Sequence, residues 1–258
     1  TVATGLASEN VAARVAREVP GVDLVVVGHS HRELADSTIG TALVTQPRNW
    51  ARSVSVSRVS LARSGGRWHV TGHKGGVVRA RGHAEQSELL AVTADAHRRA
   101  VELSTSPIGT TAAAWRADSA RVVDTPIIDF VLEVERRTSG ADLASVAAFS
   151  LNAAFGPGPI TVAKMAELYP FENNVLRAVR ISGRKLRAYL EFSSRYFRER
   201  AVGDSLIDAA IPGYNYDIVA GVDYVVDISR PIGSRVTTLS RNGRAVSDTD
   251  SFTMALHD

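Results

Sequence analysis

The sequence predicts an α/β region followed by an α+β region, and three observations carry this prediction. A β-branched apolar run at residues 22–27 is typical of a buried parallel strand in an α/β sheet. Residues 85–103, rich in alanine and charged side chains, form a helical stretch between two differently patterned regions. After residue 107, short helical segments alternate with strand-like segments, which favours a second, α+β domain.

The composition is that of a globular protein with a hydrophobic core. The chain has 258 residues, is 45% hydrophobic and has a mean hydropathy of -0.02. Because no apolar run reaches about eighteen residues, we expect no membrane span. The first six residues lack a basic and an apolar segment, so no signal peptide is expected. The missing initiator Met suggests a processed or truncated product.

Charge and cysteine content exclude several kinds of chemistry. Cysteine is absent, which excludes disulfides, thiolate metal sites and cysteine nucleophiles. The formal charge is only +3, although the sequence pI is about 9.4. The basic residues are scattered along the sequence, whereas nucleic-acid binding needs a continuous basic face with stacking aromatics. We therefore expect a solvated arginine-rich surface and no nucleic-acid partner.

The first region has predictable elements in a clear order. Apolar residues at helical spacing predict one helix, which Pro20-Gly21 ends. Strict alternation predicts a half-buried strand that turns at Ser64-Gly65-Gly66 and returns as a hairpin. The predicted elements are a helix over 8–19 and strands over 22–27, 41–45, 53–61 and 68–71.

Two histidines follow the first strand. Gly28 ends the strand, and His29 and His31 come after it at positions i and i+2. Side chains at this spacing in an extended or turning segment point the same way, and imidazole is the commonest metal ligand. A hydrolase metal needs at least three protein ligands, so this pair alone does not complete a site. The other nearby histidines are irregularly spaced and are predicted to be surface residues: His69, His73 and His83.

The second region begins near Pro107. Thr125 as N-cap and Pro126 at the first helical position predict a helix to Arg137. Asn242-Gly243 predicts a type I′ hairpin turn. The remaining predicted elements are an apolar run at 143–149, a rigid loop at 156–159, a helix from Thr161 to 169, a strand over 175–181, a helix over 185–197 and strands over 222–228, 235–240 and 251–256.

Several of these segments match known motifs. Residues 28–31, Gly-His-Ser-His, resemble the last metal-binding motif, GH[ST]H, of calcineurin-like metallophosphoesterases. The segments 169–173, 181–191, 214–224 and 227–235 resemble the C-terminal domain of the 5′-nucleotidase family, and its bacterial branch of 2′,3′-cyclic-nucleotide 2′-phosphodiesterase/3′-nucleotidases. The resemblance runs over nearly the whole chain in the family's order and spacing.

The resemblance implies an architecture. It implies that residues 1–83 are the C-terminal portion of a four-layered α/β/β/α metallophosphoesterase domain. Residues 84–106 would form a connecting helix. Residues 107–258 would be the substrate-binding 5′-nucleotidase C-terminal domain, lacking its last segment. The earlier metal motifs of the family would lie upstream of Thr1, so the chain is expected to be a fragment.

The resemblance also implies roles for five residues. His29 and His31 would each ligate one of two divalent metal ions, manganese or zinc, which polarise the phosphoryl group. Phe171 would stack on the nucleobase and Asn173 would hydrogen-bond it. Asn152 stands where 5′-nucleotidases carry a phosphate-holding arginine, and this departure favours the cyclic-nucleotide branch. No catalytic residue is assigned.

Two functions remain open at this point. The first is a metal-dependent hydrolase of nucleotide phosphoesters, a 2′,3′-cyclic phosphodiesterase and 3′- or 5′-nucleotidase, of which this chain alone is expected to be inactive. The alternative is a catalytically silent nucleotide-binding module that has lost the metal half. The expected partner is a nucleotide or nucleoside, with no protein partner evident. The resemblance implies a location outside the cytoplasm: periplasmic, secreted or attached to the wall.

Overall fold

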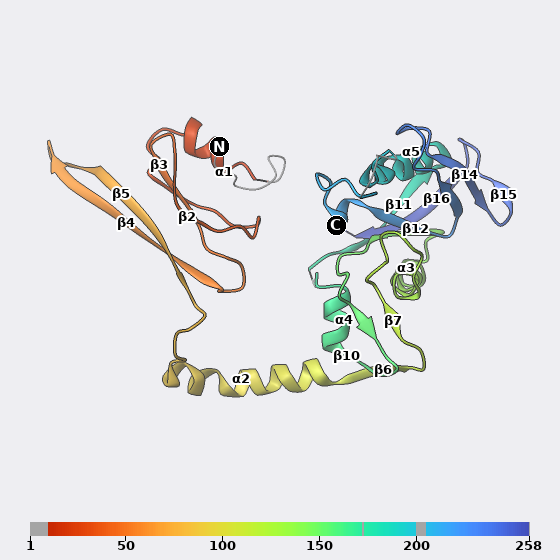
Figure 1. Cartoon of the computed structure of the whole chain (residues 1–258), viewed down its shortest axis with the longest axis horizontal. Coiled ribbons are helices and arrows are strands. Elements are labelled where there is room, and N and C mark those ends of the chain that lie inside the picture. Colours follow the sequence, from red (N-terminus) through yellow and green to blue (C-terminus); the bar gives the residue numbers. More distant parts are fainter. Residues whose placement is uncertain (1–9, 172, 200–204, 258) are drawn as a thin grey trace. The chain divides into compact units, whose positions relative to one another are not determined.

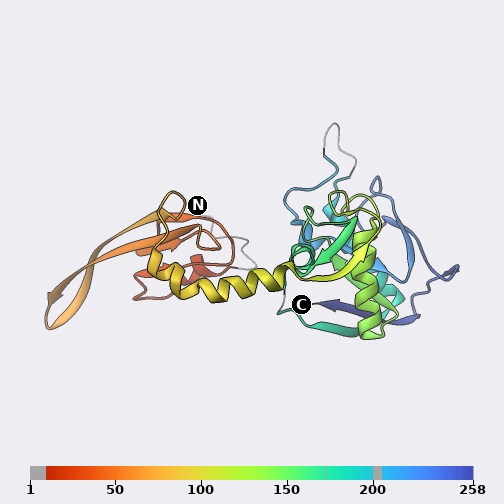
Figure 2. The same cartoon turned by 90° about the horizontal axis from the view of Figure 1, so that it is seen from below.

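The computed structural model describes residues 10–171, 173–199 and 205–257 (Figure 1). The chain divides into two compact units, Thr1–Thr93 (unit 1) and Ala94–Asp258 (unit 2). The limit falls within helix α2, Ser87–Thr105, which Figures 1 and 2 show as one uninterrupted ribbon. The helix predicted over residues 85–103 is thus confirmed, whereas the domain boundaries at 83/84 and 106/107 stay predictions.

Unit 1 contains a small mixed sheet. Strand β1 (Leu24–Val26) runs parallel to β3 (Ala42–Gln46), and β2 (Leu34–Ile39) pairs antiparallel on the other side of β3. Helix α1 (Ala12–Glu18) contributes to the core under this sheet, together with β3. The parallel strand is confirmed, and β2 is an element that the sequence analysis missed.

The predicted burial of β1 is wrong. In the described residues β1 is an edge strand, and its Val26 side chain is 69% exposed. Val25 and Val27 belong to or pack against the unit 1 core, whereas Leu24 and Val26 point to the opposite face. A continuous apolar run predicts burial on both faces, but here only one face is covered.

A long hairpin completes unit 1. Strands β4 (Ser53–Ser64) and β5 (Arg67–Arg79) pair along their whole length around Gly65 and Gly66, which have φ of 58° and 79°. The alternation of β4 is confirmed, but its faces are reversed, because Val54 and Val56 are exposed and Ser53 is buried. Polar contacts explain this reversal: Ser53 Oγ donates to Glu33, and Thr45 Oγ1 donates to Ser55 Oγ over 3.0 Å.

The hairpin histidines differ from one another. His69 and His83 are exposed, as predicted. His73 is half-buried, with Nε2 3.1 Å from the carbonyl oxygen of Thr41, so its prediction as a surface residue is wrong. His73 is half-buried because it lies in the middle of the long strand β5, and this part of β5 packs near β2. A Cβ added at Gly75 would lie 2.2 Å from the carbonyl oxygen of Ala35.

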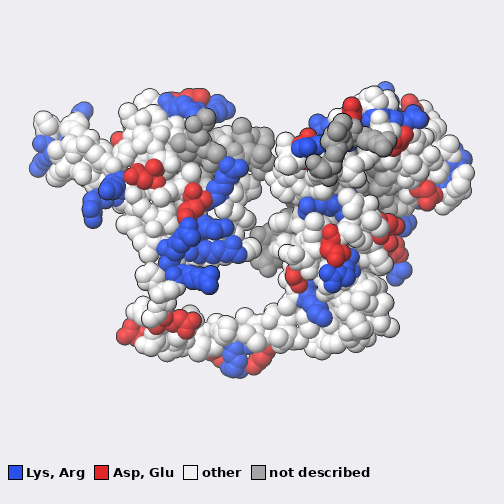
Figure 3. Space-filling model, viewed as in Figure 1, with Lys and Arg blue, Asp and Glu red and all other residues white. Residues whose placement is uncertain are grey.

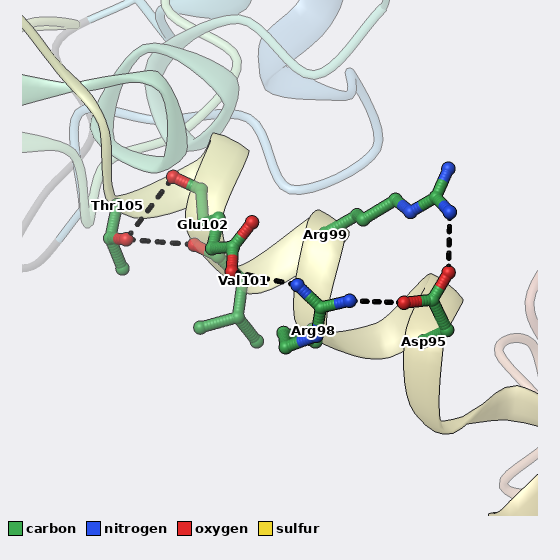
Figure 4. A network of polar contacts seen from close by, with 6 residues as sticks. All are labelled: Asp95, Arg98, Arg99, Val101, Glu102 and Thr105. Carbon is green, nitrogen blue, oxygen red and sulfur yellow. Dashed lines mark hydrogen bonds and ion pairs between the residues drawn. The ribbon is translucent and has the colours of Figure 1, made fainter.

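Helix α2 has no buried residue. Its surface carries ion pairs between residues one turn apart, as Figure 4 shows. Asp95 pairs with Arg98 and Arg99, and Arg98 also forms an ion pair with Glu102 at 3.3 Å. The Thr105 hydroxyl donates to the Val101 carbonyl over 2.8 Å near its end. Such pairs support a helix none of whose residues is buried in the described structure.

Unit 2 is built on a four-stranded sheet of order β11-β16-β8-β12. Strands β16 and β8 are parallel, and the outer strands pair antiparallel to them. The sheet strands and their helices are β8 (Leu143–Ala147), β11 (Leu176–Ser182), β12 (Asp217–Ala220), β16 (Ser251–His257), α3 (Pro126–Ser139) and α5 (Gly183–Ser193). The other elements are β6 (Pro107–Thr111), β7 (Trp115–Arg116), β9 (Ala154–Phe155), β10 (Gly158–Thr161), α4 (Val162–Leu168), η1 (Ser194–Tyr196), η2 (Gly213–Asn215), β13 (Asp223–Val226), β14 (Val236–Arg241) and β15 (Arg244–Ala245).

The sheet is covered on both faces. Residues of α3 form one core with alternate residues of β8, and residues of α5 form another with the intervening ones. The predicted cap at Thr125 and Pro126 is confirmed by the backbone, although the Thr125 side chain makes no capping hydrogen bond. The Asn242-Gly243 turn is also confirmed, with φ of 50° and 76° as a type I′ turn requires. The fold class predicted from the sequence, α/β and α+β, is confirmed.

Candidate functional site

The predicted metal ligands lie in the loop between β1 and β2. Because β1 and β3 are parallel, their carboxyl ends meet at one edge of the sheet, where α/β proteins bind ligands. His29 and His31 are both exposed and adopt left-handed backbone conformations, with φ of 68° and 55°. Ser30 between them donates to the side-chain oxygen of Gln46 over 3.0 Å. The loop is therefore a turn anchored to the end of β3.

The described residues do not complete a metal site around this loop. Within residues 10–171, 173–199 and 205–257, no group of three or more His, Cys, Asp or Glu side chains is placed to hold a metal ion. Two imidazoles fall short of the ligand set that a hydrolytic zinc or manganese ion needs. We therefore derive no catalytic step through a metal, and His29 and His31 remain predicted ligands.

An aromatic cluster lies at one edge of the unit 2 sheet. It consists of Phe149, Tyr169, Phe171 and His257. The ring centroids of Phe149 and Phe171 are 4.9 Å apart, those of Tyr169 and His257 are 5.1 Å apart, and Tyr169 and Phe171 are separated by 5.7 Å. The cluster is thus one continuous set of ring contacts.

The strand order explains how the aromatic cluster forms. Phe149 follows β8, and His257 is the last residue of β16. These strands are parallel, so their carboxyl ends share one sheet edge. Helix α4 ends just before Tyr169, and the segment that follows it places Phe171 beside Phe149 at this sheet edge.

Phe171 is half-exposed rather than part of the core. Its exposed fraction is 42%, and its neighbours Phe149 and Tyr169 meet it at interplanar angles of 73° and 80°. Perpendicular contacts of this kind hold a ring in place. A ring fixed by its neighbours and still partly exposed can stack on a planar ligand.

The predicted polar residues lie differently. Asn173 and Asn152 are both exposed, and neither makes a hydrogen bond with another described residue. Asn174 instead donates from Nδ2 to the Tyr169 hydroxyl over 3.1 Å. It also lies 3.5 Å from Nδ1 of His257. The structure therefore attaches Asn174 to the aromatic cluster, and sequence reasoning missed it.

A buried polar network borders the same edge. Asp217 opens the edge strand β12 and pairs in register with Ala147, the last residue of β8. Its carboxylate accepts from the Tyr189 hydroxyl over 2.7 Å, and Ser145 Oγ lies 2.9 Å from that hydroxyl. Burial raises the pKa of Asp217, whereas the Tyr189 hydrogen bond and the charge of His257 lower it. The network thus lies at the sheet edge that also carries the aromatic cluster.

Comparisons with known protein sequences identify a family and several relatives that this chain resembles. The sequence profile described as 5′-nucleotidase, C-terminal domain, matches residues 107–258. The chain is 23% identical to a trifunctional nucleotide phosphoesterase of Bacillus subtilis, over 95% of this chain and 20% of that protein. It is 24% identical to a 2′,3′-cyclic-nucleotide 2′-phosphodiesterase/3′-nucleotidase of Salmonella typhimurium, over 93% of this chain and 46% of that protein.

Solved structures agree on the fold. A Staphylococcus aureus protein described as a 5′-nucleotidase superposes with a TM-score of 0.72 and 25% identity, covering 99% of this chain and 50% of that one. The 5′-nucleotidase precursor of Thermus thermophilus superposes with a TM-score of 0.53 at 21% identity, over 98% of this chain and 52% of that one. The chain thus spans half or less of the length of most of these relatives. By the match over residues 107–258, the chain belongs to the family that carries the 5′-nucleotidase C-terminal domain.

Proposed function

We propose that this chain is part of a hydrolase of nucleotide phosphoesters, a 2′,3′-cyclic-nucleotide phosphodiesterase and 3′- or 5′-nucleotidase. The aromatic cluster carries the proposal, because it holds the half-exposed Phe171 ring beside polar groups at a sheet edge. The relatives named as nucleotide phosphoesterases support the same class of reaction. In this proposal unit 2 binds the nucleoside, and two divalent ions, manganese or zinc, serve the complete protein.

The roles of individual residues are part of the proposal. Phe171 stacks on the nucleobase, and an asparagine of the following turn orients it. Asn173 is the residue that the resemblance implies, and Asn174 is the one with contacts to the aromatic cluster. Asn152 lies in a turn after β8 and takes part in phosphate binding. We also propose a location outside the cytoplasm; in the described residues, no helix is long and apolar enough to cross a membrane.

Hydrolysis tests the proposed function directly. The complete gene product that includes this chain, loaded with manganese or zinc, should release phosphate from 3′-AMP or open the ring of 2′,3′-cyclic AMP. A protein that binds adenosine but leaves every nucleotide phosphoester intact under both metals would establish the alternative, a silent nucleotide-binding module. That alternative is favoured by one observation, the incomplete metal-ligand set of the described residues.

Replacement of Phe171 should weaken nucleoside binding. Because stacking on an aromatic side chain contributes about 1–3 kcal/mol per base, Phe171→Ala should raise the Kd for adenosine by about tenfold or more. Isothermal titration measures this directly. Phe192→Ala is the matched control, since Phe192 is 56% exposed on α5 and stacks only under Arg195. Equal affinity in both variants would contradict the role of Phe171.

Metal binding by this chain alone should be weak and should depend on the histidine loop. Among the described residues the two imidazoles have no third ligand, and such a pair would hold a metal mostly by water, so we expect a Kd for zinc above about 10 µM. His31→Ala should remove this binding, whereas His69→Ala, an exposed histidine on β5, should leave it unchanged. Isothermal titration calorimetry with zinc measures the Kd of the native chain and of both variants. Tight binding that survives His31→Ala would contradict the predicted ligand.

A further inference from the structure

Five arginines that are scattered in the sequence come together in unit 1. They are Arg32, Arg48, Arg52, Arg79 and Arg81, and we refer to them as the arginine rim. Figure 3 shows Lys and Arg side chains gathered on one part of this unit's surface. Unit 1 itself brings these residues together, because Arg79 ends β5 and the other four lie in the loops that follow β1, β3 and β5.

Backbone and side-chain contacts tie these three loops to one another. Ser53 pairs in register with Arg79, and the amide of Ala80 donates to the Arg52 carbonyl over 3.0 Å. The Arg48 amide donates to Ser53 Oγ over 2.8 Å, and the same hydroxyl donates to Glu33 over 3.0 Å. The loops thus meet around Ser53, which places the five rim arginines on neighbouring segments.

The charge of the arginine rim is largely unbalanced. Arg79 forms an ion pair with Glu33, with 3.3 Å between the guanidinium nitrogen and the carboxylate oxygen. In the described part of the chain, the other four rim arginines have no carboxylate within ion-pair distance. All five side chains belong to exposed residues. Four guanidinium groups without a carboxylate partner among the described residues make a surface that favours an anionic ligand with several charges.

An exposed indole links the rim to the histidine loop. Trp50 is 77% exposed, and the guanidinium carbon of Arg52 lies 4.7 Å from the centroid of its ring. The ring of His31 lies 6.2 Å from that of Trp50, centroid to centroid. Trp50 itself has φ of 58°, an uncommon conformation for a bulky residue, and its ring contacts in the described structure are those with Arg52 and His31. Rim, indole and histidine loop are therefore adjacent.

We propose that the arginine rim and Trp50 bind the chain of a single-stranded oligonucleotide whose terminal phosphoester lies at the histidine loop. Basic groups that follow a phosphate backbone, interleaved with an aromatic ring that stacks on bases, are the usual means of binding single strands. A mononucleotide has one phosphate and leaves most of the rim unused. This inference rests on the proposed function, which puts a reacting phosphoester at His29 and His31.

An acidic peptide is the competing ligand, and the structure favours the oligonucleotide. Both would pair with guanidinium groups, but an acidic peptide has no planar base for Trp50. The two ligands therefore differ in their dependence on the indole. They also differ in the place at which they end, since only the oligonucleotide carries a terminal phosphoester for the histidine loop.

Fluorescence anisotropy with a labelled hexauridylate that carries a 3′-phosphate tests the inference. With four arginine–phosphate contacts, raising the salt from about 50 to about 200 mM should weaken binding about 50-fold. Trp50→Ala should weaken binding about tenfold by loss of stacking. The double variant Arg48→Gln/Arg52→Gln should weaken it at least about fivefold and reduce the salt dependence. A glutamate hexapeptide should not displace the hexauridylate.

Matched controls come from the other end of the hairpin. Trp68, 65% exposed, and the exposed Arg63 and Arg67 lie at the β4–β5 turn, far along the register from Ser53 and Arg79. Trp68→Ala and Arg63→Gln/Arg67→Gln should leave binding of the hexauridylate unchanged. Circular dichroism of every variant confirms the fold.

Three results would each overturn the inference. The first is a hexauridylate that binds no more tightly than 3′-UMP. The second is equal loss of binding in the rim variants and the hairpin-turn variants. The third is displacement of the hexauridylate by the glutamate peptide. The assay requires no turnover, so absence of nucleotide hydrolysis would overturn the proposed function and would not change this readout.

Discussion

Arg235→Leu should lower the free energy of unfolding of unit 2 by about 3 kcal/mol or more, because it leaves buried backbone carbonyls without donors. Arg235 is fully buried. Its guanidinium donates to the carbonyl oxygens of Ser194, Phe197 and Arg230, which ties the end of α5 to the loop before β14. For a unit of this size we expect the Tm to fall by about 10 °C.

An exposed arginine provides the control. Arg184 lies on α5 and makes no side-chain hydrogen bond with another described residue. Arg184→Leu removes the same charge, and its unfolding free energy should change by less than about 0.5 kcal/mol. Urea unfolding followed by circular dichroism compares the two variants. Equal stability of both would contradict the role of Arg235 as a donor to the backbone.

Glu135→Gln should stabilise the protein above neutral pH and leave it unchanged in acid. Burial, and then the charge of Asp217, raises the pKa of Glu135 to about 8. The residue is 7% exposed, and its Oε2 has no hydrogen-bond partner in the described structure. The folded state therefore keeps this carboxyl protonated, while the unfolded state ionises near its ordinary pKa of 4.5.

The sign of the pH dependence follows from this difference. Between about pH 4.5 and 8 the folded state binds more protons than the unfolded state, so stability falls as pH rises through this window and levels off above it. The neutral glutamine does not lose this stability as pH rises. At pH 8 we expect the free energy of unfolding of Glu135→Gln to exceed that of the native chain by about 3 kcal/mol.

Urea unfolding from pH 4 to pH 9 measures the predicted divergence. Glu133→Gln is the control on the same helix, since Glu133 is half-exposed and pairs with Arg136 and Arg137. Its stability should follow that of the native chain at every pH. Parallel curves for Glu135→Gln and the native chain would show that Glu135 is ionised in the folded protein.

Local signals explain most of what the sequence predicted correctly. The cap at Thr125 and Pro126, the strand β8 and the Asn242-Gly243 turn each depend on a few neighbouring residues. The strand β12 was missed because Asp217–Ala220 is only four residues long and alternates little. The burial of β1 was mispredicted because it depends on what covers the second face of the sheet, which composition does not encode.

The candidate site was only partly predictable for the same reason. Phe171 came from a motif, but Phe149, which it contacts, and His257, which contacts Phe149, come from the ends of two strands that pair although they are far apart in the sequence. Asn174 follows the predicted Asn173 directly, and its contacts with the Tyr169 hydroxyl and with Nδ1 of His257 distinguish it. The arginine rim likewise depends on strand register, so the scattered arginines of the sequence did not indicate it.

The parallel pairing of β8 with β16 has a consequence for synthesis of the chain. β16 occupies an inner position of the sheet, yet it follows β8 by more than a hundred residues, as the hydrogen bond from the Asp142 amide to Thr253 across 111 positions shows. Until the ribosome has released residues 251–257, β8 lacks its inner neighbour and β11 has no strand to pair with. Nascent unit 2 therefore exposes unpaired edges of β8 and β11 until residues 251–257 have left the ribosome, and pairs this far apart in sequence close slowly.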